Sequence, residues 1–191
     1  VLIRLREDTI TSDWSGAIND SSTISAYHKV IGSLINDSKR SIESYHDWLN
    51  LRETVSINTV SGTKNYNLSS GQEIKIVDVI NATTGMHLNQ VSKVYLNTVK
   101  YPTDDTGEPL YYGFNGSDTS NNLKVDLSPV PTSVQTLNFE IIKHQDALTL
   151  AATVLKVPSQ PVILGAWARA IAERGEDGGT QSSLMAQESS E

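Results

Sequence analysis

A long amphipathic segment constrains the fold of this chain most. Between Thr23 and about Leu49, large or apolar side chains recur mainly every three, four or seven residues, which predicts one long helix. This apolar stripe consists of Ile24, Tyr27, Ile31, Leu34, Ile35, Ile42, Tyr45 and Leu49. Charged residues such as Lys39 and Glu43 lie mostly off the stripe, so we expect them on another face of the helix.

An alternating segment follows the helix at once. Val55 and Ile57 lie on one face of Thr54–Val60, and a Ser61-Gly62 turn leads into Lys64–Leu68, which alternates again. This pattern predicts a β-hairpin. Because neither a lone helix nor a lone hairpin can bury its apolar face, we expect the two elements to depend on each other.

Several further short strands fill the middle of the chain. Segments that alternate or are rich in β-branched residues predict strands at Glu73–Asn81, Met86–Val91, Leu110–Asn115, Asn122–Leu127 and Val134–Lys143. Residues 91–101 fit a short helix as well as a strand. Many short strands at this spacing predict an antiparallel sandwich or barrel.

Helical patterns return near the end of the sequence. Asp146–Leu155 fits a helix, although its two threonines weaken the pattern. Pro158 and Pro161 mark the start of a clearer helix, and Gly175 marks its end. The apolar face of this helix consists of Ile163, Leu164, Trp167, Ala168, Ile171 and Ala172.

These segments together predict an α+β fold. We expect a helical bundle built from the N- and C-terminal segments, residues 1–52 and 144–191. An inserted antiparallel β-sandwich or barrel would then occupy residues 53–143. A length of 191 residues suits one large domain or two small ones.

Composition excludes several classes of site. The chain has no cysteine, which rules out disulfides and thiolate metal sites. Its formal net charge of −7 argues against a surface built to grip nucleic acid phosphates. No apolar run approaches the roughly 20 residues of a membrane-spanning helix, and no signal-peptide pattern is visible. Because the sequence starts at Val1 rather than Met, we expect residues to precede it.

The motifs that usually mark catalysis or cofactor binding are missing from the sequence. There is no nucleophile elbow, no phosphate-binding P-loop and no dinucleotide fingerprint. Glu43 and His46 share a helix face, but a solvated helix end explains them better than a metal site. Asp104, Asp105 and Glu108 lack the spacing of a calcium loop and fit an acidic turn. These patterns therefore select no catalytic or metal site, and paired carboxylates for glycoside hydrolysis stay open because nothing in the sequence selects a pair.

Two tryptophans are the main candidates for contact residues. Trp48 continues the stripe of the long helix and Trp167 lies on a later helix face, so core or subunit interface is the preferred interpretation over ligand stacking. The candidate interface set adds Arg169, Leu184 and Met185 from the C-terminal part of the chain. Small residues around them, such as Ala166 and Ala170, would permit close packing.

Five segments in a fixed order carry a family resemblance. They are the helix that ends at Trp48, then Thr54–Leu68, Gly107–Tyr112, Leu127–Pro131 and Val157–Ala170. In this order the chain resembles the head-to-tail connector, or adaptor, proteins of tailed bacteriophages, the group that includes tail tubular protein A of short-tailed phages. The resemblance covers roughly residues 24–176.

The resemblance implies a structural virion protein without enzymatic activity, cofactor or metal. It implies a ring of this chain, about twelve copies, between the portal protein and a tail or nozzle protein. Double-stranded DNA would pass through the lumen without specific binding, and no membrane would be contacted. The helical domain would face the ring and the portal, and the C-terminal segment would dock on the portal. The protein would assemble in the cytoplasm of the host bacterium and reside at the portal–tail junction of the virion.

The charge of the chain adds a hypothesis about this lumen. Net negative charge would multiply around a ring, and an acidic lumen would repel the phosphates of a passing duplex. The DNA would then slide without sticking.

Two other function classes stay open at this point. The chain could be another virion component, such as a tail-tube or fibre-attachment module, although long helices at both ends disfavour a pure β tube protein. It could also be a β-sandwich binding module or a hydrolase. That reading needs a concave pocket with convergent polar groups.

Overall fold

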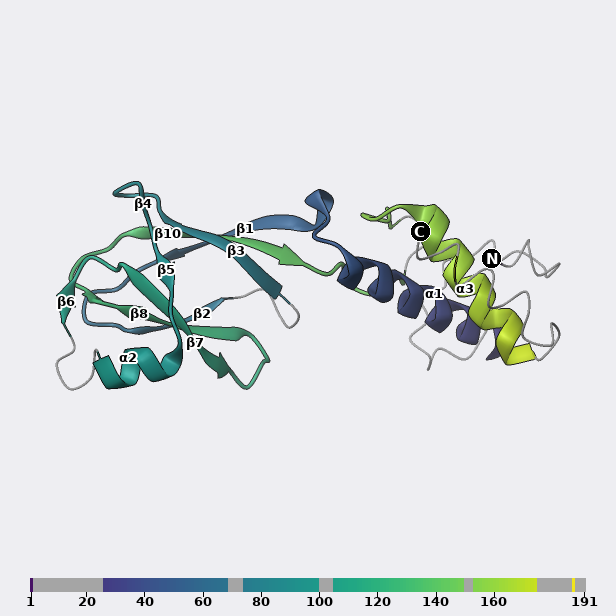
Figure 1. The fold of residues 1–191 in the computed structure, drawn as a ribbon, viewed down its shortest axis with the longest axis horizontal. Helices are drawn as coiled ribbons and strands as arrows, with labels where there is room; N and C mark the ends of the chain where they lie inside the picture. The colour runs from purple at the N-terminus through teal and green to yellow at the C-terminus, as the bar shows by residue number, and fades with distance from the viewer. Residues whose placement is uncertain (2–25, 69–73, 100–104, 150–152, 175–186, 188–191) are drawn as a thin grey trace. The chain divides into compact units, whose positions relative to one another are not determined.

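The computed structural model describes residues 1, 26–68, 74–99, 105–149, 153–174 and 187 (Figure 1). The chain divides into two compact units. Unit 1 comprises Val1–Leu51 and His144–Glu191, and unit 2 comprises Arg52–Lys143. The described residues form helices and several antiparallel sheets, which confirms the predicted α+β class.

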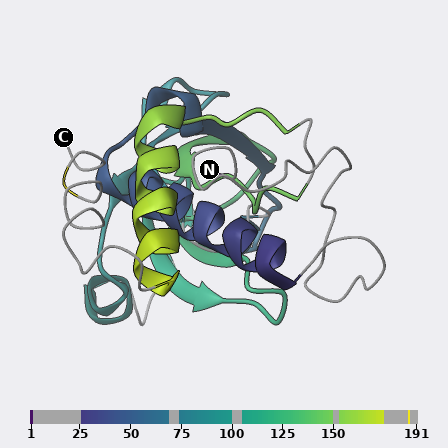
Figure 2. The ribbon, with the colours of Figure 1, turned by 90° about the vertical axis from the view of Figure 1, so that its right-hand side faces the viewer.

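A pair of helices forms the body of unit 1. Helix α1 (Ala26–Tyr45) and helix α3 (Ser159–Arg174) lie side by side, and Figure 2 shows them crossing. Ile31 of α1 packs with Ala170 and Ile171 of α3 in a buried cluster. Val1, Tyr27, Leu34, Ile35 and Trp167 pack around that cluster. Alanines on α3 contribute little bulk, so the two helices can approach closely.

Helix α1 ends four residues before the predicted boundary. It stops at Tyr45 rather than near Leu49, and a short 3₁₀ helix η2 (Leu49–Leu51) follows. The indole N–H of Trp48 donates to the carbonyl of Ile42 at 2.9 Å. This bond satisfies one of the carbonyls that a helix end leaves open, so the tryptophan folds back and the helix stops. Residues 23–25 of the predicted helix lie outside the described residues.

Unit 2 contains two four-stranded sheets. The first has the order β1-β10-β3-β4 and is antiparallel throughout. Its strands are β1 (Arg52–Asn58), β10 (Thr136–Lys143), β3 (Ile74–Asn81) and β4 (Met86–His87). The second has the order β2-β8-β7-β5 and is antiparallel except where β5 pairs with β7. Its strands are β2 (Asn65–Leu68), β8 (Leu123–Ser128), β7 (Tyr111–Ser117) and β5 (Asn89–Gln90).

The apolar faces of these two sheets share one core, so unit 2 is built in two layers. Val79, Leu137, Phe139 and Ile141 come from the first sheet, and Leu68, Tyr112, Val125 and Leu127 come from the second. The Tyr112 ring stands edge-on to the Phe139 ring, with centroids 6.0 Å apart. A third, two-stranded parallel sheet joins β6 (Thr106–Gly107) to β9 (Val130–Pro131).

The predicted hairpin after α1 is wrong. Strand β1 pairs with β10, and β2 pairs with β8, so the two segments belong to different sheets. The chain changes sheets at Gly62, whose φ of 76° suits glycine. The Tyr66 hydroxyl fixes this corner, because it accepts the Val60 N–H at 2.9 Å and donates to the Thr63 carbonyl at 2.9 Å. Apolar residues of β1 therefore pack on the core of unit 2, not on a hairpin partner.

Two ambiguous segments of unit 2 are now assigned. The predicted strand at residues 86–91 is two short strands, β4 and β5, with buried Leu88 where the chain passes between sheets. The segment that fitted helix or strand contains helix α2 (Lys93–Val99). Leu96 of α2 is buried over Gly113 of β7, where a Cβ would lie 2.6 Å from the Leu96 Cδ1 atom. Glycine at this position therefore lets α2 lie on the sheet.

The C-terminal helical predictions have different outcomes. Helix α3 begins at Ser159, between the two prolines that marked its start, and ends at Arg174, before Gly175. The predicted helix at 146–155 is wrong for its described residues, 146–149 and 153–155, which are not helical. None of the helices among the described residues is long and apolar enough to cross a membrane.

Candidate functional site

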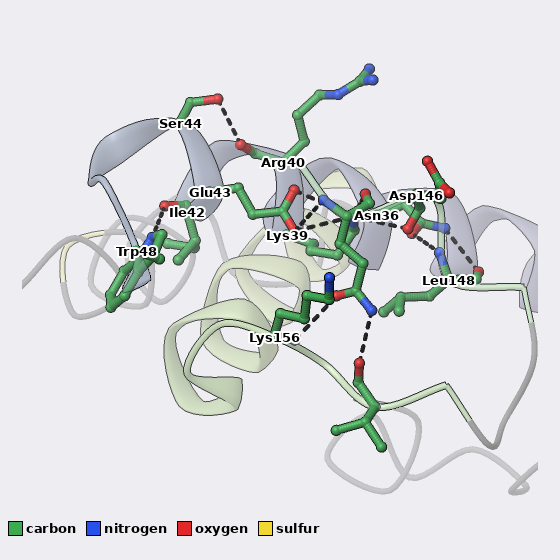
Figure 3. Close-up of polar contacts among 12 residues, drawn as sticks. Asn36, Lys39, Arg40, Ile42, Glu43, Ser44, Trp48, Asp146, Leu148 and Lys156 are labelled. Atoms are coloured by element: carbon green, nitrogen blue, oxygen red, sulfur yellow. Dashed lines mark hydrogen bonds and ion pairs between the residues drawn. The ribbon is translucent and has the colours of Figure 1, made fainter. Parts of the chain in front are cut away.

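A row of polar side chains on α1 is the most developed polar cluster in the described part of unit 1. Asn36, Lys39 and Glu43 follow one another at spacings of three and four residues, which places them on one face of the helix. Lys39 and Glu43 are almost completely buried. Figure 3 shows the three side chains directed toward the segment that contains Asp146 and Leu148. We call Asn36, Lys39 and Glu43 the α1 polar row.

The charged members of the α1 polar row hold main-chain atoms. The Lys39 ammonium lies 3.3 Å from each carboxylate oxygen of Glu43. It also donates to the carbonyls of Gln145 and Asp146, the latter at 3.1 Å. Glu43 in turn accepts the Gln145 N–H at 3.3 Å. Burying two charges is costly unless each is paired and hydrogen-bonded, and both conditions are met here.

Asn36 extends the row toward the N-terminus of α1. Its side-chain oxygen accepts the Leu148 N–H at 2.7 Å, and its side-chain nitrogen donates to the Leu148 carbonyl at 3.2 Å. The amide thus pairs with one residue as a neighbouring strand would. Side chains of α1 therefore satisfy the backbone of residues 145–148 that a helix would have satisfied internally, which explains why the predicted helix is absent there.

Two further amides tie down the chain that leads into α3. The Gln145 side chain donates to the Val154 carbonyl at 2.8 Å and accepts the Lys156 N–H at 3.1 Å. The Asn50 side chain donates to the Lys156 carbonyl at 3.3 Å. Residues 153–156 are thereby held from both sides without regular secondary structure.

Three large apolar side chains of unit 1 are exposed next to these fixed segments. Tyr45 is 78% exposed, Leu49 is 74% exposed and Val154 is 80% exposed. Apolar side chains held outward on a fixed backbone are suited to contact with another protein. The hydrogen bonds around them hold main-chain atoms, and none of those described above joins a nucleophilic side chain to a base. This network therefore serves to fix the structure.

The predicted interface residues are placed as follows. Trp48 is half-buried against His46, with ring centroids 5.1 Å apart, and Trp167 packs on the α1–α3 cluster. Arg169 is exposed and donates to the buried Ser38 hydroxyl at 2.8 Å. All three therefore make contacts within unit 1. Leu184 and Met185 lie outside the described residues.

Described members of the weak metal candidates make other contacts. Glu43 is buried with Lys39, whereas His46 is exposed and makes an edge-on ring contact with Trp48. Asp105 accepts the Val130 N–H through its carbonyl at 2.7 Å, and Asp104 lies outside the described residues. Over the described ranges, no three histidine, aspartate or glutamate side chains gather as a metal site would require.

Unit 2 has buried polar groups that the sequence did not reveal. The fully buried Asp126 on β8 contacts Lys93 at the start of α2 and accepts from the Asn115 amide at 3.0 Å.

At the tip of the β7–β8 hairpin, Asp118 accepts the backbone N–H groups of Ser120 and Asn122, each at 2.8 Å. Hydrogen bonds from Asn122 hold the pKa of Asp118 below its ordinary value. Both aspartates organise the fold locally.

Sequence reasoning missed the α1 polar row. The two charged members were expected off the apolar stripe, on another face of the helix, yet both are buried. A signal was present, because Lys39 and Glu43 stand four residues apart, the spacing of a helical ion pair. Their burial depends on a segment 106 residues further along the chain, and no local pattern indicates it.

The comparison with protein families gives a match over nearly the whole chain. Residues 2–190 match the family described as SU10 adaptor protein. No match to the chain was found among the curated proteins.

Proposed function

The chain belongs to the SU10 adaptor protein family, and from this premise we propose that it is a head-to-tail adaptor of a tailed phage, forming a ring between portal and tail through which DNA passes. The family match over residues 2–190 carries this proposal. The match also confirms the resemblance of the sequence to phage adaptor proteins.

The contacts of the described residues support a role in assembly. The most elaborate polar network, the α1 polar row, consists of side chains that hold backbone. The exposed apolar residues Tyr45, Leu49 and Val154 offer surface for contact between proteins. A ring subunit needs broad contact surfaces more than a cleft. We therefore propose a structural, non-enzymatic role.

The proposed ring has about twelve copies, with unit 1 toward the portal and unit 2 outward or toward a tail or nozzle protein. The residues proposed for subunit or portal contact are Trp48, Trp167, Arg169, Leu184 and Met185. The net charge of −7 on each chain supports a lumen that repels the duplex and lets it slide. The proposed location is the portal–tail junction of the virion, after assembly in the host cytoplasm.

Electron microscopy of the protein mixed with its portal tests the proposal. We expect a ring of this chain stacked on one end of the portal, seen only when both proteins are present. A portal from an unrelated phage is the matched control and should stay bare. Free chains beside bare portals would contradict the proposal. Binding of glycans, or hydrolysis of a substrate panel, would favour the binding-module or hydrolase reading instead.

A further inference from the structure

The first sheet of unit 2 has one long edge and one short edge. Strand β1, at one edge, has seven residues, whereas β4, at the other edge, has two. Within the part of the chain that the structure describes, β10 is the strand that pairs with β1. The opposite side of β1 therefore presents a row of main-chain donors and acceptors.

Strand β1 lacks the features that usually protect such an edge. Its charges are confined to Arg52 and Glu53, and Thr54–Asn58 contains no charge, proline or glycine. The register irregularity of this sheet lies between β10 and β3, so it does not bend β1 away. The other edge is protected by the shortness of β4, and nothing comparable among the described residues protects β1.

The pairing with β10 shows which backbone groups point outward. The Thr59 N–H donates to the Gln135 carbonyl at 2.8 Å. Because main-chain groups alternate in direction along a strand, those of the odd-numbered residues of β1 also point toward β10. The backbone groups of Thr54, Ser56 and Asn58 therefore point away from it.

The side chains of these three residues already form hydrogen bonds with side chains of β10. Thr54 bonds to Glu140 at 2.7 Å, Ser56 bonds to Asn138 at 2.8 Å, and Asn58 bonds to Thr136 at 2.9 Å. A partner strand would therefore form hydrogen bonds with the outward main-chain groups of β1.

The sequence of β1 is complementary to itself. In an antiparallel pair centred on Ser56, Val55 of one copy lies opposite Ile57 of the other, and Thr54 lies opposite Asn58. No like charges oppose each other in this register. Three residue pairs would exchange roughly six main-chain hydrogen bonds.

We propose that β1 pairs with β1 of a second copy about a two-fold axis, which joins two first sheets into one continuous sheet. A two-fold contact uses the same surface on both copies and closes the edge, whereas a head-to-tail strand contact would leave another edge open. The proposed ring repeats a head-to-tail contact, so this two-fold contact belongs to the free chain before ring assembly. It does not depend on the proposed function.

The test compares Ser56→Pro with Ser56→Ala in the free full-length chain. Proline removes one outward N–H and leaves the β1–β10 ladder intact, while alanine removes the same hydroxyl and keeps that N–H. Light scattering coupled to size-exclusion chromatography should give twice the chain mass for wild type and Ser56→Ala. Ser56→Pro should give the mass of one chain, with an unchanged circular dichroism spectrum.

Hydrogen exchange on the wild-type chain keeps the proposal testable if Ser56→Pro does not fold. The amides of Thr54 and Ser56 should exchange at least tenfold more slowly at high protein concentration than after dilution. The amide of Ile57, which faces β10, is the internal control and should not respond to dilution. A wild-type chain that is monomeric at every concentration would overturn the proposal. So would a Ser56→Pro dimer, or outward amides that ignore dilution.

Discussion

The two units of this protein bury charge for different purposes. In unit 1, Lys39 and Glu43 stand on the same helix and use their remaining hydrogen-bonding capacity on the backbone of another segment. In unit 2, Asp126 and Lys93 join a strand to the helix that covers the sheet, beside a large apolar core. Among the described residues, the apolar cluster of unit 1 is much smaller. We therefore expect the described part of unit 1 to depend more on its polar network, and the two units to respond to different substitutions.

The tryptophans make this difference measurable. All three, Trp14, Trp48 and Trp167, belong to unit 1, and unit 2 has none. Tryptophan fluorescence therefore reports the unfolding of unit 1, while the strand signal in circular dichroism reports chiefly unit 2. The first two predictions below compare these two signals during denaturation by urea.

The largest effect is expected from Phe139→Ala in the core of unit 2. Phe139 is fully buried between the two sheets, so its truncation should lower the free energy of unfolding by about 3–5 kcal/mol. The strand signal should change at lower urea, and the fluorescence transition should move much less. Equal shifts of both signals would show that the units unfold together and would remove the contrast between them.

Lys39→Met should reverse that pattern. It leaves the buried Glu43 carboxylate and two carbonyls without their cation, which should cost roughly 3 kcal/mol. The fluorescence transition should then move to lower urea, and the strand signal should not. Lys156→Met, at an exposed position of the same unit whose hydrogen bonds use the main chain, is the matched control and should have little effect. The double variant Lys39→Met with Glu43→Leu should recover part of the loss.

Gly113→Ala tests how closely α2 lies on the sheet. The added Cβ would lie 2.6 Å from Leu96 Cδ1 and 3.0 Å from the Val91 carbonyl oxygen, which should cost about 1–3 kcal/mol in unit 2. The cost should be smaller in a Leu96→Ala background, because the closest atom is then gone. Simple additivity of the two substitutions, measured by the strand signal, would argue against this contact.

The smallest effect concerns Asp118 and depends on pH. Hydrogen bonds from Asn122 lower the pKa of Asp118 in the folded state, so they stabilise the fold above the ordinary pKa of aspartate. This contribution is lost as pH falls through the lowered folded pKa. Asp118→Ala should therefore be less stable than wild type at pH 7, and the difference should shrink below about pH 4. A difference that does not change between pH 7 and pH 3 would contradict this assignment.

Local patterns predicted the elements of this fold better than their partners. Strands β3 and β10 follow from their alternation, and the bounds of α3 follow from Pro158, Pro161 and Gly175. The pairing of β1 with β10 could not be predicted, because a turn between β1 and β2 fits a hairpin and a change of sheet equally well. The choice depends on contacts between distant parts of the sequence.

The candidate site was predicted only in part, for a related reason. Trp48 and Trp167 were chosen because they continue helix faces; both make contacts within unit 1, and their contact with another subunit stays a prediction. The α1 polar row was missed because its partners are backbone atoms, and any sequence can supply those. Burial of Lys39 and Glu43 becomes visible only once residues 145–148 are placed against α1.

Electron cryomicroscopy of the intact virion at the portal–tail junction tests the central proposal most directly. The account predicts a closed ring of copies of this chain between portal and tail, with DNA passing through its centre. A virion in which the chain is absent from that junction, or present there as single copies outside any ring, would contradict it.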